Sequence, residues 1–236
     1  RRPPRSTLDR SSAASDVYKR QRHAYGITVL KASHKKVRRL KKDYEPEIHG
    51  NKFWTSSWLI MDYLEQQGLP REARVLEAGC GWGLAGIYCA RRYDAVVTGV
   101  DADDAVFPYL DLHAAVNEVQ VKTVKSRFED IKKKMLARQD ILLGSDVCFW
   151  DNMVEPLYKL VDKAVKVGVQ QVILADPGRP PFEEVCRLCV DKFGGITQEW
   201  AVEEPVRASG TLLIVGSLPH KAVSYTHLTL PTSDLV

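Results

Sequence analysis

The sequence predicts an α/β fold: a doubly wound, mostly parallel sheet of seven strands, with one antiparallel strand and helices on both faces. Three observations predict it. Short apolar runs of strand length alternate with segments of helical spacing through the middle of the chain. A glycine-rich turn over 79–83 joins the first of these strands to a helix. Two runs near the end, separated by a polar loop, read as a closing antiparallel pair.

The two ends of the chain differ in composition from the rest. Residues 1–22 are rich in Arg and Ser without an apolar period, and with residues 223–236 they resemble translated linker sequence. We therefore expect one domain over 23–222, made of a lead-in over 23–70 and a core over 71–222. The leader carries a net charge of plus five and the tail minus one, so the total of plus four leaves the domain neutral. The basic charge balance therefore does not indicate nucleic-acid binding.

Composition also predicts the compartment. No apolar run reaches the length of a membrane span, and the first residues lack the apolar core of a secretory signal. Five cysteines, an odd number, fit a reducing compartment. Cys186 and Cys189 form a lone C-x-x-C pair without the further ligands that zinc needs, so we read them as core residues and predict no metal site. We expect a soluble, cytoplasmic monomer with no membrane partner.

The lead-in predicts a short strand and two helices. Residues 26–30 read as the strand. The segment 31–42 has seven basic residues in twelve, and its apolar spacing predicts an amphipathic helix with a solvated cationic face. An acidic protein or an RNA backbone is the alternative use of that face. Residues 54–64 carry an apolar helical stripe that begins at Trp54 and ends near Gly68.

The core predicts strands and helices in alternation after a first strand over 73–76. Further strands are expected over 95–100, 121–124, 140–149 and 171–175, and the closing pair over 196–202 and 211–217. Helices are expected over 84–90, 105–116, 153–167 and 182–193. Ligands of open α/β sheets bind outside the carboxyl ends of the strands. Side chains at those ends are therefore candidate site residues, namely Asp101, Phe128, Ser145 and Asp146.

The glycine turn indicates the ligand. Glu77 stands two residues before the Gly-x-Gly-x-Gly pattern, and a carboxylate there suits a cationic cofactor, S-adenosylmethionine. The alternative is a nicotinamide fingerprint, since 81–86 match G-x-G-x-x-G and Asp101 follows twenty residues after Gly81. That alternative puts Glu77 and Gly79 inside a buried strand, where neither is favoured. A glycine turn that holds no ligand is the third interpretation.

These residues resemble the class I, seven-β-strand S-adenosylmethionine-dependent methyltransferases, which have a Rossmann-like core, over roughly residues 24–218. The protein-lysine methyltransferase branch is similar at Trp54, 77–81, Asp101, Asn117, 145–147 and Phe149. The turn over 176–179 is similar to that of enzymes acting on the electron-transfer flavoprotein β subunit. The resemblance implies that the cofactor is held by Trp54, Glu77, Gly79, Gly81, Asp101, Phe128 and Ser145. Asp101 would bind the ribose, Phe128 the adenine edge, and Asp146 would face the methyl acceptor.

The resemblance implies N-methylation of a protein lysine. A lysine with a pKa of about 10.4 must lose a proton before it reacts, and Asp146 would orient the amine while it does. No Asn-Pro-Pro-Tyr motif follows the fourth strand of the core, which argues against planar amide or adenine nitrogens as acceptors. A small-molecule amine or heteroaromatic nitrogen is the second candidate acceptor. A catalytically silent domain that binds the cofactor or RNA is the alternative from another class.

Overall fold

The computed structural model describes residues 20–47, 50 and 52–218, and it confirms the predicted α/β class. Seven strands of the described residues form one sheet, in which β9 runs in the direction opposite to the other six. In order across the sheet they are β5 (Val121–Lys125), β4 (Val96–Asp101), β3 (Arg74–Ala78), β6 (Ile141–Ser145), β7 (Gln171–Asp176), β9 (Ala208–Gly216) and β8 (Ile196–Val202).

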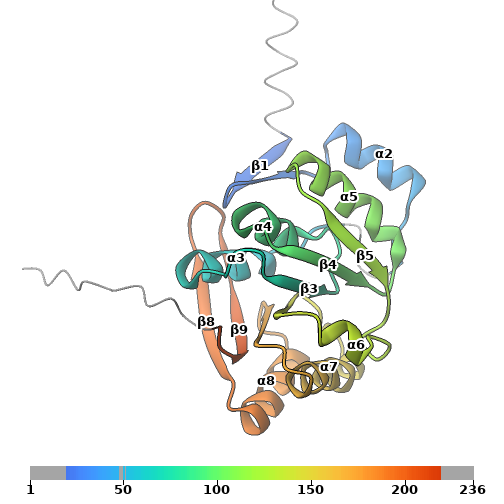
Figure 1. Ribbon diagram of the computed structural model, residues 1–236. Helices are drawn as coiled ribbons and strands as arrows, with labels where there is room; N and C mark the ends of the chain where they lie inside the picture. Colours follow the sequence, from blue (N-terminus) through green and yellow to red (C-terminus); the bar gives the residue numbers. More distant parts are fainter. Residues whose placement is uncertain (1–19, 48–49, 51, 219–236) are drawn as a thin grey trace, which may run out of the picture.

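Helices cover both faces of this sheet (Figure 1). On one face lie α3 (Ser56–Gln67), α4 (Leu84–Tyr93) and α5 (Phe107–Val116); on the other lie α6 (Lys133–Leu136), α7 (Val154–Lys166) and α8 (Pro180–Phe193). The central strand β3 serves both cores, because side chains alternate along a strand. Val75 packs with α3 and α4, whereas Leu76 and Ala78 pack with α7 and α8. Burial on both faces explains why β3 reads as a nearly continuous apolar run.

The strand order reverses beside β3, and this reversal places the site. From β3 the chain passes through α4 to β4, the short helix η1 (Asp104–Val106) and α5, and reaches β5 at the sheet edge. It then returns to β6 on the other side of β3 and continues through η2 (Asp151–Met153) and α7 to β7. A crevice forms at the carboxyl ends of the strands where such an order reverses.

A β-hairpin precedes the sheet. Its strands, β1 (Gln21–Ala24) and β2 (Ile27–Leu30), are joined by Tyr25 and Gly26, which have φ of 52° and 72° as a type I′ turn requires. The predicted leader ended at residue 22, so β1 corrects that boundary by including Gln21 and Arg22. Residues 1–19 and the predicted tail lie outside the described residues.

The structure also contains the two helices expected in the lead-in. The basic segment forms α2 (Lys35–Asp43), in which Val37 is buried and the six Lys and Arg side chains are exposed, as predicted. The next helix, α3, starts at Ser56, so Trp54 precedes it rather than beginning it. Within the described part of the chain, none of the helices combines the length and apolar character that a membrane crossing needs.

The C-x-x-C pair lies in the core, as predicted. Cys186 and Cys189 both belong to α8 and are buried against the sheet. Burial raises the pKa of each thiol to about 12, so both are protonated at neutral pH. Protonated, buried thiols are poor nucleophiles and behave as small apolar side chains.

Candidate active site

A cavity of about 370 Å³ opens at the carboxyl ends of β3, β4, β5 and β6. This volume lies in the range of small-molecule sites, about 300–1,000 Å³. All but one of the predicted site residues line the cavity, namely Trp54, Gly79, Gly81, Asp101, Phe128, Ser145 and Asp146. Other lining residues carried no sequence signal, among them Gly50, Lys52, Trp150, Asn152 and Met153.

The glycine loop forms the wall at the tip of β3. A Cβ on Gly79 would come within 2.6 Å of the Val147 side chain, so this glycine permits close packing. Both glycines have positive φ, +64° and +50°, but Gly81 differs in that a Cβ there would meet nothing within 4 Å. Since Gly81 lines the cavity, a side chain at this position would fill space that is open to a ligand. The loop therefore fits a cofactor that needs close approach to the backbone.

Asp101 ends β4 beside this loop. The N–H of Gly81 donates to Asp101 Oδ2 at 2.9 Å, and the N–H of Asp103 donates to Oδ1 at 3.1 Å. Burial raises the pKa of Asp101, while these backbone donors act in the opposite direction. Each carboxylate oxygen has more than one lone pair, so Asp101 can also accept from the two hydroxyls of a ribose. Phe128 supplies a nearby apolar wall, with its ring 3.7 Å from the Cβ position of Gly79.

Glu77 is the exception, and the structure places it elsewhere than predicted. It does not line the cavity; it is 1% exposed within β3, and the N–H of Gly86 in α4 donates to its Oε2 at 3.0 Å. Burial raises the pKa of Glu77 to about 8, although the N–H groups of Gly86 and Ala85 oppose the shift. Glu77 does lie inside the strand, contrary to expectation, but burial favours its protonated form, and the first turn of α4 donates a hydrogen bond to it. Its position suits an anchor of α4 on β3 rather than a direct contact with the cofactor.

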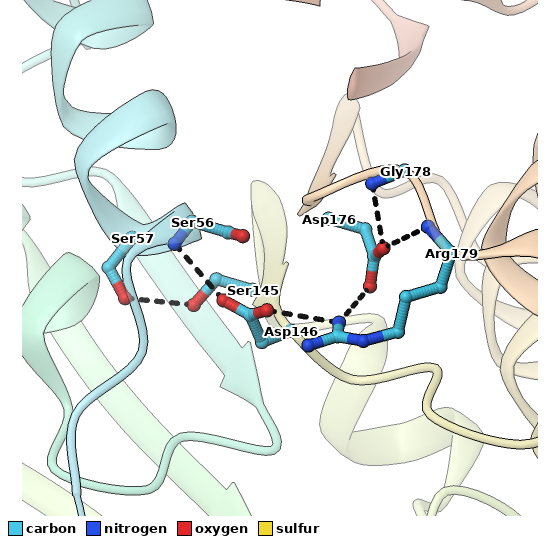
Figure 2. Close-up of polar contacts among 7 residues, drawn as sticks. All are labelled: Ser56, Ser57, Ser145, Asp146, Asp176, Gly178 and Arg179. Carbon is cyan, nitrogen blue, oxygen red and sulfur yellow. Dashed lines mark hydrogen bonds and ion pairs between the residues drawn. The ribbon is translucent and has the colours of Figure 1, made fainter. Parts of the chain in front are cut away.

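The acceptor half of the cavity is built around Asp146, directly after β6. Asp146 has a φ of 56°, a left-handed conformation that Asp tolerates better than most residues. The N–H of Ser56, at the start of α3, donates to Asp146 Oδ2 at 3.0 Å, and the hydroxyls of Ser57 and Ser145 lie 3.0 Å apart (Figure 2). The start of α3 and the end of β6 are thus joined by two polar contacts beside the cavity.

Arg179 completes this group from the turn after β7. Its Nη1 lies 3.0 Å from Asp146 Oδ1 and 2.6 Å from Asp176 Oδ2, so one guanidinium is shared by two acids (Figure 2). Burial raises the pKa of Asp176, and the backbone and side chain of Arg179 oppose that shift. The sequence predicted a turn over 176–179 but gave no sign that Arg179 contacts Asp146.

Aromatic side chains form the wall next to Asp146. The ring centroids of Trp54 and Phe149 lie 5.0 Å apart, and the Arg179 guanidinium carbon lies 4.4 Å from the Phe149 centroid. Lys52 Nζ lies 4.0 Å from the Trp54 centroid. Trp150, which also lines the cavity, is 50% exposed, so the cavity meets solvent there. The wall thus combines apolar rings with a buried acid.

Comparison with known proteins identifies the family of the chain. The lysine methyltransferase family matches residues 34–183, which is more than half of the chain. Histidine protein methyltransferase 1 homolog of Dictyostelium discoideum is 28% identical over 128 residues, covering 51% of this chain and 41% of that protein. The chain spans well under half the length of the curated relatives it matches.

Solved structures agree on the fold. Precorrin-6y C5,15-methyltransferase of Geobacter metallireducens has a TM-score of 0.55 at 10% identity, covering 75% of this chain and 95% of its own. A 16S rRNA methyltransferase of T. thermophilus, solved in complex with AdoMet and guanosine, has a TM-score of 0.50 at 22% identity, covering 73% and 45%. With this fold and the match over 34–183, the chain belongs to the lysine methyltransferase family, whose methyl donor is S-adenosylmethionine.

Proposed function

We propose that this chain methylates the side-chain nitrogen of a protein lysine, with Asp146 at the acceptor position. The observation that carries the proposal is one cavity that joins the glycine loop and Asp101 to Asp146. A donor held at one end and an acceptor held at the other lie in the proximity that a displacement requires. The match to the lysine methyltransferase family supports the choice of acceptor.

The residues at the glycine-loop end of the cavity suit S-adenosylmethionine. When bound, S-adenosylmethionine supplies a methyl group on a sulfonium for in-line displacement. Gly79 and Gly81 would allow its amino-acid part to approach the backbone, Asp101 would accept from the ribose hydroxyls, and Phe128 would cover the adenine. Trp54 and Ser145 would close the site toward the acceptor. Glu77 would act through α4, without touching the ligand.

The acceptor half suits a long cationic side chain. Trp54 and Phe149 offer flat apolar surface to a methylene chain, and Asp146 offers oxygen lone pairs to the terminal nitrogen. The exposed side of the cavity at Trp150 favours a residue presented by a protein over a small molecule enclosed on all sides. A small-molecule amine stays the second candidate, because aromatic walls also suit a free ligand.

Incubation of the purified protein with a cell lysate and isotopically labelled methyl donor tests the proposal. We expect a labelled protein band above the background of lysate without added protein, and mass spectrometry should place the methyl group on lysine. Label on a small molecule alone, or no label, would contradict the proposal. Label on histidine would contradict the lysine acceptor and would match the acceptor that the name of the Dictyostelium relative gives.

A further inference from the structure

Arg179 links the buried acid of the acceptor site to a second buried acid. The Asp146 and Asp176 side chains are 2% and 0% exposed, whereas Arg179 is 23% exposed. Asp176 Oδ1 also accepts from the N–H groups of Gly178 and Arg179, at 3.1 and 2.8 Å. Asp176 therefore fixes both the turn and the guanidinium that the turn carries (Figure 2).

The aromatic wall holds the same guanidinium from another side. Its carbon lies 4.4 Å from the Phe149 centroid and 5.6 Å from that of Trp54, and both rings line the cavity. An amine bonded to Asp146 Oδ1 at about 2.9 Å would lie within about 6 Å of Arg179 Nη1. At that separation the charge of Arg179 acts on the protonation of the acceptor amine.

We propose that Arg179 is a positioning residue of the transfer: it orients Asp146 toward the acceptor nitrogen and favours the neutral, reactive form of that amine. This inference rests on the proposed function. A carboxylate alone favours an ammonium, because opposite charges stabilise the charged form. A nearby guanidinium favours the neutral amine. With Arg179 in place, Asp146 accepts a hydrogen bond from the amine without holding an extra proton on it.

The step at which Arg179 acts is the loss of the proton. The acceptor ammonium first releases one proton to water. The amine lone pair then forms the N–C bond as the C–S bond breaks, and the electron pair of that bond stays on sulfur. The positive charge passes to the methylated nitrogen. The first of these events sets the pH dependence of the rate, through the local balance of acids and guanidinium.

Other charged and titratable groups face this cluster from several elements. The negative charge of Asp176 acts on the thiols of Cys148 and Cys186. Burial raises the pKa of each thiol to about 12, so both thiols are neutral near pH 7. Among the described residues, the nearby charged groups include Lys52 before α3, Asp151 in η2, Glu183 in α8, and Asp101, Arg127 and Glu129 on the cavity wall. They are the same in every variant, so a comparison between variants isolates Arg179.

The pH profile of kcat tests this role, since it reports ionisations in the substrate complex. The acceptor is the protein labelled in the lysate experiment, purified and used at saturation, with wild type, Arg179→Lys and Arg179→Gln. We expect Arg179→Gln to move the acidic limb of the profile to higher pH, because the amine becomes harder to deprotonate. Arg179→Lys keeps the charge but loses the planar guanidinium, so it should lower kcat while the acidic limb of the profile stays at its wild-type pH.

The Arg179→Gln substitution is also measured in a chain that carries Asp176→Asn, because the second acid complicates the comparison in the wild-type chain. Without Arg179 the two acids could share one proton, which would mask part of the shift. In an Asp176→Asn background, adding Arg179→Gln should move the limb by about one pH unit or more. Unfolding temperatures and calorimetric affinity for S-adenosylhomocysteine verify that each variant is folded.

The outcomes separate this inference from the proposed function. A limb that does not move in either background, with kcat reduced alike in the Lys and Gln variants, would show a purely structural role and overturn the inference alone. A wild-type protein that transfers no methyl group to an amine would overturn both. If Asp176→Asn does not fold, the comparison of Arg179→Gln with Arg179→Lys in the wild-type chain decides.

Discussion

At Gly81, the stability cost of a left-handed backbone conformation can be measured separately from the affinity lost when a side chain fills ligand space. Gly81→Ala should cost about 1 kcal/mol of stability, because an L-residue at positive φ is strained, and it should also weaken binding of S-adenosylhomocysteine by about tenfold or more. Gly26→Ala is the matched control, since Gly26 also has positive φ and open space but does not line the cavity. We expect it to lose similar stability with unchanged affinity. Calorimetry and urea unfolding measure the two effects, and equal affinity in both variants would contradict the assignment of Gly81.

Glu77 makes stability depend on pH. Its pKa is raised from 4.5 to about 8 in the folded protein, so between those values the folded state holds a proton that the unfolded state releases. The free energy of unfolding should therefore fall as pH rises from about 4.5 to 8.

Glu77→Gln should remove this contribution, so the variant gains stability over wild type as pH rises. Urea unfolding at pH 5 and pH 8 measures it, with the exposed Glu203→Gln as a control that keeps the wild-type slope. Parallel curves for wild type and Glu77→Gln would contradict the buried, protonated carboxyl.

At the residue scale the sequence predicts positions better than contacts. Asp101 and Gly81 were predictable because their place at strand ends follows from periodicity. The side chain of Glu77 was misplaced because the spacing does not tell which face of β3 it occupies or that α4 supplies donors. The contact between Ser56 and Asp146 spans ninety residues of sequence, and the left-handed φ of Asp146 that accompanies it has no sequence signature.

At the element scale, Asn117 attaches the β1–β2 hairpin to the C-terminal end of α5. Its Oδ1 accepts from the N–H of Thr28 at 2.7 Å, and its Nδ2 donates to the carbonyls of Thr28 and His113 at 2.9 and 2.8 Å. Asn117→Ala should cost about 1–3 kcal/mol, because it removes the side-chain partner of the partly buried N–H and carbonyl of Thr28. Amide hydrogen exchange should become faster at Thr28 and Leu30.

Thr28→Ala is the matched control for this prediction, since it keeps the backbone groups that Asn117 binds. Protection of the hairpin should stay at the wild-type level in this variant. If Asn117→Ala leaves hairpin exchange unchanged, then packing rather than these hydrogen bonds holds the hairpin in place.

The elements of the sheet were predictable because each follows from a local pattern: apolar runs for β3, β4, β6 and β7, β-branched residues for β5, and a polar turn between β8 and β9. The first strand was missed because Gln21 and Arg22 carry no apolar alternation, and their pairing with β2 comes from the turn at Tyr25 and Gly26. Hydrophobic periodicity does not reveal strand pairing that a turn sets.

At the scale of the whole molecule, the domain is a neutral body with a cationic helix on its surface and a cavity where the strand order reverses. That arrangement separates two tasks along the cavity: holding the cofactor at the glycine loop and Asp101, and orienting the acceptor at Asp146. If the tasks are separate, a change at one end should leave the other intact.

The paired measurement of turnover and cofactor affinity in Asp146→Asn tests this account most directly. The amide keeps the shape of the side chain but loses the charge-assisted contacts to Arg179 and the acceptor. We predict that turnover falls on the order of a hundredfold or more, while affinity for S-adenosylhomocysteine stays within a few-fold of wild type. Loss of both together, or turnover that survives the substitution, would contradict the assignment of Asp146 to the acceptor.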